Sequence, residues 1–164
     1  MHKNLIKIFL LVFLYFQNSI SYSAVKNKII ANVESQIVSS YELKNKIRTI
    51  LILSNQTLDQ NNINKSKGLA LNSLVDYKLK KEEISKHNVS TNDNAVDNHL
   101  RTVSSKYNTD IKGLKELFKK SDLDFDFYLD EIKTEFSWQK IIFDIYNKKI
   151  SLYENEINKE LSDY

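Results

Sequence analysis

The chain has 164 residues, a formal net charge of +3, two glycines, no proline and no cysteine. This length suffices for one domain with its own core. The scarcity of turn residues argues against an all-β fold, and the lack of cysteine excludes disulfides, cysteine nucleophiles and cysteine-based zinc sites. Frequent Leu, Ile, Lys and Glu favour long helices instead.

The first residues are typical of a secretory signal peptide. Lys3 and Lys7 precede the unbroken apolar run IFLLVFLYF at 8–16, and small polar residues follow. We expect residues 1–23 to be removed by cleavage after Ser23, with an uncleaved membrane anchor as the alternative. The apolar run is shorter than the roughly 20 residues of a membrane span. The exported chain, residues 24–164, is therefore expected to have no stable membrane span.

Loss of the leader also changes the charge. Without Lys3 and Lys7, the 24 basic residues of the chain become 22, against 21 acidic ones. A nucleic-acid partner requires a dense basic face, which a nearly neutral chain does not supply. We therefore expect no nucleic-acid partner.

A short hairpin is predicted at the start of the exported chain. Residues 28–33 and 37–38 are apolar strand candidates, separated by a polar turn at 34–36. Ser39-x-x-Glu42 then fits a capping box, in which each residue satisfies a backbone N–H of the other. The helix that it opens is predicted to run to about Ser54.

Helical periodicity dominates the rest of the chain. After a polar loop at 55–65, helices are predicted at 66–87, from Ser90-x-x-Asp93 to about 107, and at 110–120 behind Thr109. The longest helix, about 124–150, would be capped by Asp122 or Asp124, and Ser151-x-x-Glu154 would open a final one. The expected fold is mainly α, with a short N-terminal β-hairpin followed by about six helices, in one domain over 24–164.

No catalytic or metal-binding pattern is evident. His2 lies in the leader, and His87 and His99 lack a second ligand at a metal spacing. The acidic run between Asp122 and Glu131 lacks the glycine of a calcium loop, because Phe127 stands at that position. Helix capping explains the acids better. We expect no cofactor, no metal and no enzymatic activity.

The segment FSWQKIIFDIY at 136–146 is apolar around most of its helical circumference. Such a helix is either deeply buried or exposes one face to another molecule. Ordinary core packing and a partner surface both remain open for this segment. The candidate client-binding residues, chosen for excess apolar surface, are Phe118, Phe127, Trp138, Ile142 and Ile145.

Several motifs, in their order along the chain, resemble the N-terminal domain of the SurA family of periplasmic chaperones. The opening strand–turn–strand and its Ile37-Val38-Ser39 step resemble the start of that domain, and Val89-Ser90 and Ile150-Ser151 match later steps. The two longest matches are Leu71-x-x-Leu74-Val75-Asp76-x-x-Leu79 and Phe125-x-x-Tyr128-x-x-x-Ile132-x-x-Glu135.

The resemblance covers essentially all of residues 24–164 and implies a helical chaperone domain in the periplasm. It departs from the family at the turn, where Gln36 replaces a frequent glycine and Glu34 a frequent Asn or Asp. It also lacks the proline common near the last helix, and the parvulin-type prolyl isomerase domains do not follow. The isomerase activity of the family is therefore not assigned to these residues.

Two functions follow as expectations. The first is an ATP-independent holdase that binds unfolded outer-membrane proteins or other exported polypeptides in an apolar groove. The alternative is a helical docking or dimerisation module without client binding, with a homodimer as one form, or the N-terminal part of a longer peptidyl-prolyl isomerase.

Overall fold

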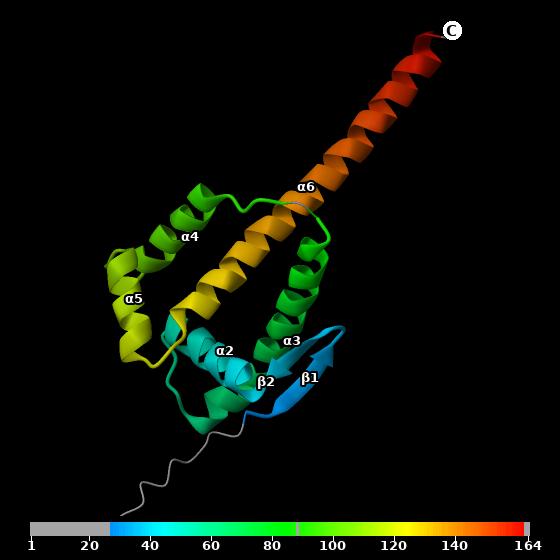
Figure 1. Cartoon of the computed structure of the whole chain (residues 1–164). Coiled ribbons are helices and arrows are strands. Elements are labelled where there is room, and N and C mark those ends of the chain that lie inside the picture. Colours follow the sequence, from blue (N-terminus) through cyan, green and yellow to red (C-terminus); the bar gives the residue numbers. More distant parts are fainter. Residues whose placement is uncertain (1–26, 88, 163–164) are drawn as a thin grey trace, which may run out of the picture.

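A computed structural model describes residues 27–87 and 89–162 of the chain. The predicted signal peptide lies outside the described residues. The predicted fold class is confirmed: a two-stranded hairpin precedes a set of helices, one of them much longer than the others (Figure 1).

The hairpin consists of β1 (Ile29–Val33) and β2 (Gln36–Ser39), which pair antiparallel. Its turn is one residue shorter than predicted, because Gln36 already pairs with Val33. Glu34 adopts a left-handed backbone with φ 51°, a conformation that glycine and asparagine accept more readily. Ser35 Oγ donates a hydrogen bond of 2.7 Å to Glu82 Oε2, which fixes the turn to the following helical layer.

Helix α2 (Ser40–Leu53) begins at the predicted capping box. Glu42 N donates to Ser39 Oγ at 3.2 Å, and Ser39 N donates to Glu42 Oε2 at 2.8 Å. The helix ends at Leu53 with Ser54 as its C-cap, and Asn55, whose φ is 53°, reverses the chain. Gln56 N donates to the Leu51 carbonyl at 2.8 Å, closing the terminus in a Schellman motif without a glycine.

Helix α3 (Gln60–Ser85) starts six residues before the predicted start at 66, so much of the predicted polar loop is helical. Asp59 caps it by accepting from Asn62 N at 2.9 Å. Its first turn has a single apolar residue, the partly buried Ile63, whereas Gln60 and Asn61 are exposed. Because it has little apolar surface to bury, it carries no apolar periodicity by which the sequence could reveal it.

Helices α4 (Asp93–Ser105) and α5 (Ile111–Lys120) begin at caps other than the predicted ones. Asn92, not Ser90, accepts from Ala95 N at 3.2 Å. Asp110, not Thr109, accepts from Gly113 N at 2.8 Å. Both caps are side chains of the Asn/Asp class, which rank at least as high as Ser and Thr for this role.

Helix α6 (Phe125–Ser162) has 38 residues and continues through Ser151, where a new helix was predicted. That prediction was wrong, because a cap motif starts a helix only where the preceding chain has left the helical conformation. No Gly or Pro lies in this segment to cause such a break. Asp124, one of the two predicted caps, accepts from Phe127 N at 2.9 Å.

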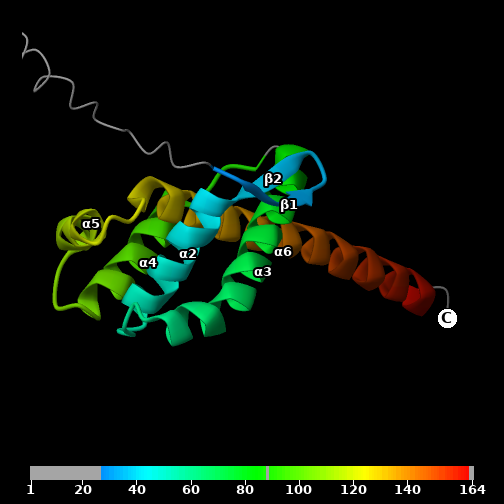
Figure 2. The same ribbon diagram turned by 90° about the horizontal axis from the view of Figure 1, so that it is seen from below.

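The N-terminal half of α6 is the centre of the fold. It lies between α3 on one side and α4 with α5 on the other, and its C-terminal half projects from the body (Figure 1). Helix α2 packs on α3 and links to α6 through Lys46 and Glu131, which lie 2.7 Å apart. The view from below shows the hairpin against α3 and the projecting end of α6 (Figure 2).

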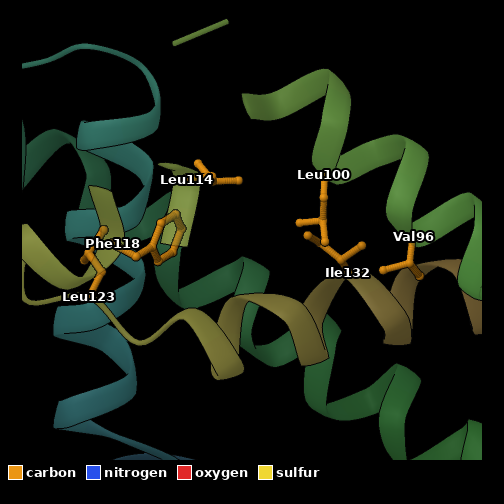
Figure 3. Packing of buried hydrophobic residues seen from close by; sticks show 6 residues of the cluster. All are labelled: Val96, Leu100, Leu114, Phe118, Leu123 and Ile132. Atoms are coloured by element: carbon orange, nitrogen blue, oxygen red, sulfur yellow. The ribbon is translucent and has the colours of Figure 1, made fainter. Parts of the chain in front are cut away.

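The largest buried cluster joins α4, α5 and the start of α6 (Figure 3). Phe118 and Leu114 are fully buried within it. Leu123 follows a second Schellman terminus at Asp122, φ 52°, and Leu123 N donates to the Phe118 carbonyl at 2.9 Å. The members of the cluster are Val96, Leu100, Leu114, Phe118, Leu123 and Ile132.

Candidate binding surfaces

An apolar groove lies between the hairpin, α2 and the start of α3. Its volume is about 410 Å³, within the range of roughly 300–1,000 Å³ typical of ligand pockets. Ile30 and Leu58 are 42% and 47% exposed at its opening, and Ile47 is buried at its base. The apolar groove is lined by Ile30, Leu43, Ile47, Leu58 and Ile63, together with Ser40, Lys44 and Arg48.

The polar members of the groove include two cations, both on α2. Arg48 Nη2 donates to the Ser121 carbonyl at 2.5 Å, and Arg48 Nη1 lies 3.9 Å from Asp122 Oδ2. This side chain therefore ties the groove to the loop after α5. The aliphatic lining supplies contact area without directional donors or acceptors, a property that favours broad rather than selective binding.

A second hollow, the central cleft, lies between α3 and α4 with α6 among its linings. Its volume is about 530 Å³. Leu69 and His99 are exposed along it, and the His99 ring packs edge-on against Phe136 with 5.9 Å between centroids. The charged groups of the apolar groove all come from α2, whereas those of the central cleft come from three helices. These include Lys46 on α2, Asp76 and Lys80 on α3, and Glu131 and Glu135 on α6.

Most of these charges are paired across helices. Lys46 Nζ lies 2.7 Å from Glu131 Oε1, and Lys80 Nζ lies 2.5 Å from Glu135 Oε2. Burial raises the pKa of Glu131 above its usual value, an effect that outweighs the attraction of Lys46. The charges of the central cleft thus hold α2 and α3 to α6.

A third link joins Tyr77 and Lys81 of α3 to Asp130 of α6. Both the Tyr77 hydroxyl and the Lys81 ammonium donate to Asp130 Oδ2. Burial opposes the charge on Asp130, but these two hydrogen bonds lower its pKa overall. Burial and the bond to Asp130 raise the pKa of Tyr77 to about 12, so its hydroxyl remains a donor at neutral pH.

The structure separates the predicted client-binding residues into two groups. Phe118 is 0% exposed in the core cluster (Figure 3). Its ring packs against the rings of Phe125 and Tyr128. It therefore contributes to the core and offers no surface in this conformation. Phe127 is partly buried against the hairpin and α3, with its ring edge-on to Tyr77 at 5.6 Å.

The other three predicted residues follow one face of α6 at helical spacing. Trp138 is partly buried and lines a small hollow with Leu79 of α3. Ile142 is partly buried and Ile145 is 41% exposed. These three residues form the Trp138 face, which continues from the body onto the projecting part of α6 and is separate from the apolar groove.

Sequence reasoning missed the lining of the apolar groove. Ile30 and Leu43 were recognised as parts of a strand and a helix, and nothing in their spacing indicated a shared hollow. Leu58 and Ile63 lay in the segment interpreted as a loop. Two apolar residues within an otherwise polar stretch were the available signal.

The acidic run has structural roles in this fold. Asp124 caps α6, Asp122 occupies a helix terminus, and Asp130 and Glu131 bind lysines. Capping, the predicted role, accounts for the first of these. Within residues 27–87 and 89–162, no group of three or more His, Asp or Glu side chains is arranged to hold a metal ion.

In the part of the chain that the structure describes, no helix combines the length with the apolar composition that a membrane span requires. Comparison of the chain with protein-family models, with curated proteins and with solved structures finds no match.

Proposed function

We propose that the chain is an ATP-independent holdase that binds unfolded exported polypeptides, outer-membrane proteins among them, in the periplasm. The observation that carries the proposal is the apolar groove, which is open to solvent and lined mainly by aliphatic side chains. Reversible burial of a client's apolar side chains there requires no nucleotide. Because such contacts have little directionality, many sequences can be accepted.

The hairpin supports an extended client. Strand β1 pairs with β2 along one edge, and in the described part of the chain no further strand joins this sheet. An extended peptide can add to an exposed strand edge while its alternate side chains enter an adjacent hollow. Ile30 belongs to both β1 and the apolar groove. Segments of outer-membrane β-strands, which alternate apolar and polar residues, suit this arrangement.

The first test measures aggregation of an unfolded outer-membrane β-barrel protein diluted from urea, followed by light scattering. We expect the exported chain, residues 24–164, to suppress scattering at a near-stoichiometric ratio. A folded, helical chain that leaves scattering unchanged would contradict the holdase proposal and favour a docking module.

Paired variants then locate the site. Ile30→Thr with Leu58→Ser should weaken suppression several-fold, because both side chains stand at the opening of the apolar groove. Ile37→Thr is the matched control, since Ile37 is 45% exposed on the same hairpin but does not line the groove. Trp138→Ser with Ile142→Ser tests the Trp138 face. Loss of suppression in this second pair alone, with helicity retained, would move the client site there.

A further inference from the structure

The projecting part of α6 carries a continuous apolar stripe. The sequence steps between its members are three, four, three, four and four residues, so all lie on one side of the helix. Each member is between 54% and 69% exposed. The stripe consists of Phe143, Tyr146, Ile150, Tyr153, Ile157 and Leu161.

The stripe is on the same side of α6 as the central cleft. Phe136 and Gln139, which line the cleft, lie seven residues before Phe143 and Tyr146. Seven residues make almost two full turns of an α-helix, so residues seven apart lie on the same face. Inside the body, α3 and α4 flank this face. Beyond the body, no other element of the described residues accompanies it (Figure 1).

The stripe provides enough surface for a dimer. Aromatic side chains present roughly 150–250 Å² each when fully buried. Six members, each more than half exposed, therefore offer about 600 Å² per copy and about 1,200 Å² for two, the lower limit of stable protein interfaces.

The order of residues along the stripe is complementary to itself when reversed. In an antiparallel pair centred between Ile150 and Tyr153, these two residues of opposite copies face each other. Tyr146 then faces Ile157 of the other copy. Phe143 lies opposite position 160, one residue from Leu161. Each aromatic ring meets an aliphatic side chain, an alternation of large and smaller groups that packs helices closely. A parallel pair would instead stack Tyr146 on Tyr146 and Tyr153 on Tyr153.

The body also disfavours a parallel pair. Because α3 and α4 flank the same face of α6 just before Phe143, two parallel copies would bring both sets of flanking helices together at one end. An antiparallel pair places the bodies at opposite ends. The overlap spans about 28 Å, at 1.5 Å per residue over the stripe.

We propose that two copies of this chain associate as an antiparallel homodimer through the apolar stripe of α6. This proposal goes beyond the holdase and does not depend on it, because the apolar groove lies at the hairpin end of the body. The dimer contact contains none of the residues that line that groove.

The experiment uses protein purified after export, studied by sedimentation equilibrium from micromolar to near-millimolar concentration. We expect a reversible monomer–dimer equilibrium with a micromolar Kd. Ile150→Glu should raise the Kd at least about 100-fold, because it places a charge at the centre of the contact. The matched control is Lys159→Glu, a charge reversal at an exposed position on the opposite side of the helix, which should leave the Kd nearly unchanged. A monomer at all concentrations, or a dimer indifferent to Ile150→Glu, would overturn the proposal.

Introduced cysteines determine the orientation, since the chain has none of its own. Tyr146→Cys and Ile157→Cys chains, mixed and mildly oxidised, should form a mixed disulfide, and each alone should not. Self-linkage of Tyr146→Cys alone would show a parallel pair and overturn the antiparallel arrangement. Circular dichroism of each variant checks that the body remains folded. The aggregation assay tests the holdase proposal separately, so failure of one proposal leaves the other standing.

Discussion

The two halves of α6 differ in burial although they belong to one helix. Up to about Ile141, which is 3% exposed, α6 packs against α3, α4 and α5. From Phe143 onward its large apolar side chains face solvent. Both halves alternate apolar and charged residues at helical spacing. The difference shows that periodicity determines which residues share a face, whereas burial depends on what lies beside that face.

The largest expected contrast is between two phenylalanines. Phe118→Ala should lower the free energy of unfolding by about 3–5 kcal/mol, because it leaves a cavity in a fully buried site. Phe143→Ala should change it by less than about 0.5 kcal/mol in the monomer, since that ring is 64% exposed. Urea unfolding at low protein concentration measures both. Equal losses would show that the extension is packed within the monomer.

The second contrast concerns two neighbouring acids that fix the packed half of α6. Asp130→Asn should cost about 1 kcal/mol at pH 7, because it weakens the charged hydrogen bonds from Tyr77 and Lys81 at a partly exposed site. The folded pKa of Asp130 is lowered, so its contribution is present above the unfolded pKa, near 4, and is lost as the pH falls through the folded pKa.

Glu131→Gln should give the opposite dependence on pH. The folded pKa of Glu131 is raised, so ionisation of this group disfavours the wild-type fold as the pH rises above about 4.3. The variant should therefore gain stability relative to wild type as the pH rises from about 4.3 through the raised folded pKa of Glu131. Urea midpoints across pH 3–7 measure both variants, and parallel profiles for the two would contradict this assignment.

An effect of similar size but opposite sign to that of Asp130→Asn is expected in the body at Thr49 of α2. Its hydroxyl is buried and has no hydrogen-bond partner among the residues that the structure describes. Thr49→Val keeps the shape and removes the unsatisfied polar group, so it should stabilise the chain by about 1 kcal/mol. Thr91→Val is the control, because the Thr91 hydroxyl is bonded to Ser137 at 3.0 Å and its loss should destabilise. Thermal unfolding of both variants provides the comparison.

The smallest effect separates the two glycines. Gly68 lies within α3, and a Cβ there would meet nothing within 4 Å, so Gly68→Ala should stabilise by about 0.5–1 kcal/mol. At Gly113 an added Cβ would lie 1.7 Å from Thr109 Oγ1 and 2.9 Å from Thr109 Cβ. Because rotation of the Thr109 side chain moves only the first of these atoms, Gly113→Ala should instead lower the melting temperature. A gain in both variants would mean that this contact is easily relieved.

Much of the fold could be predicted from the sequence because its signals are local. The capping box of Ser39 and Glu42 specifies the start of α2 with few alternatives. One error, the start of α3, arose because that turn carries no apolar periodicity, and the others arose where a local motif was ambiguous. Ser90 and Asn92 both resemble caps, and at Ser151 a cap motif occurs within a helix that never ends there.

The candidate surfaces were less predictable, because a surface is formed by segments distant in sequence. Leu58 and Ile30 line the same apolar groove only because the fold brings the hairpin and the start of α3 beside α2. Phe118 and Trp138 are equally apolar in the sequence, yet one is enclosed by three helices and the other lies beside a hollow. Composition identifies apolar residues but does not specify which of them the other helices cover.

Because α6 is long and uninterrupted, a small rotation at its base produces a large displacement of its C-terminal end. Its 38 residues correspond to a rod of about 57 Å, of which about 30 Å projects beyond the body. A tilt of about 10° at Asp130 and Glu131, which anchor the rod to α3 and α2, would move the tip by about 8 Å, because roughly 47 Å of helix lies between these residues and Ser162. The direction in which the tip points is therefore set by a few ion pairs far from it.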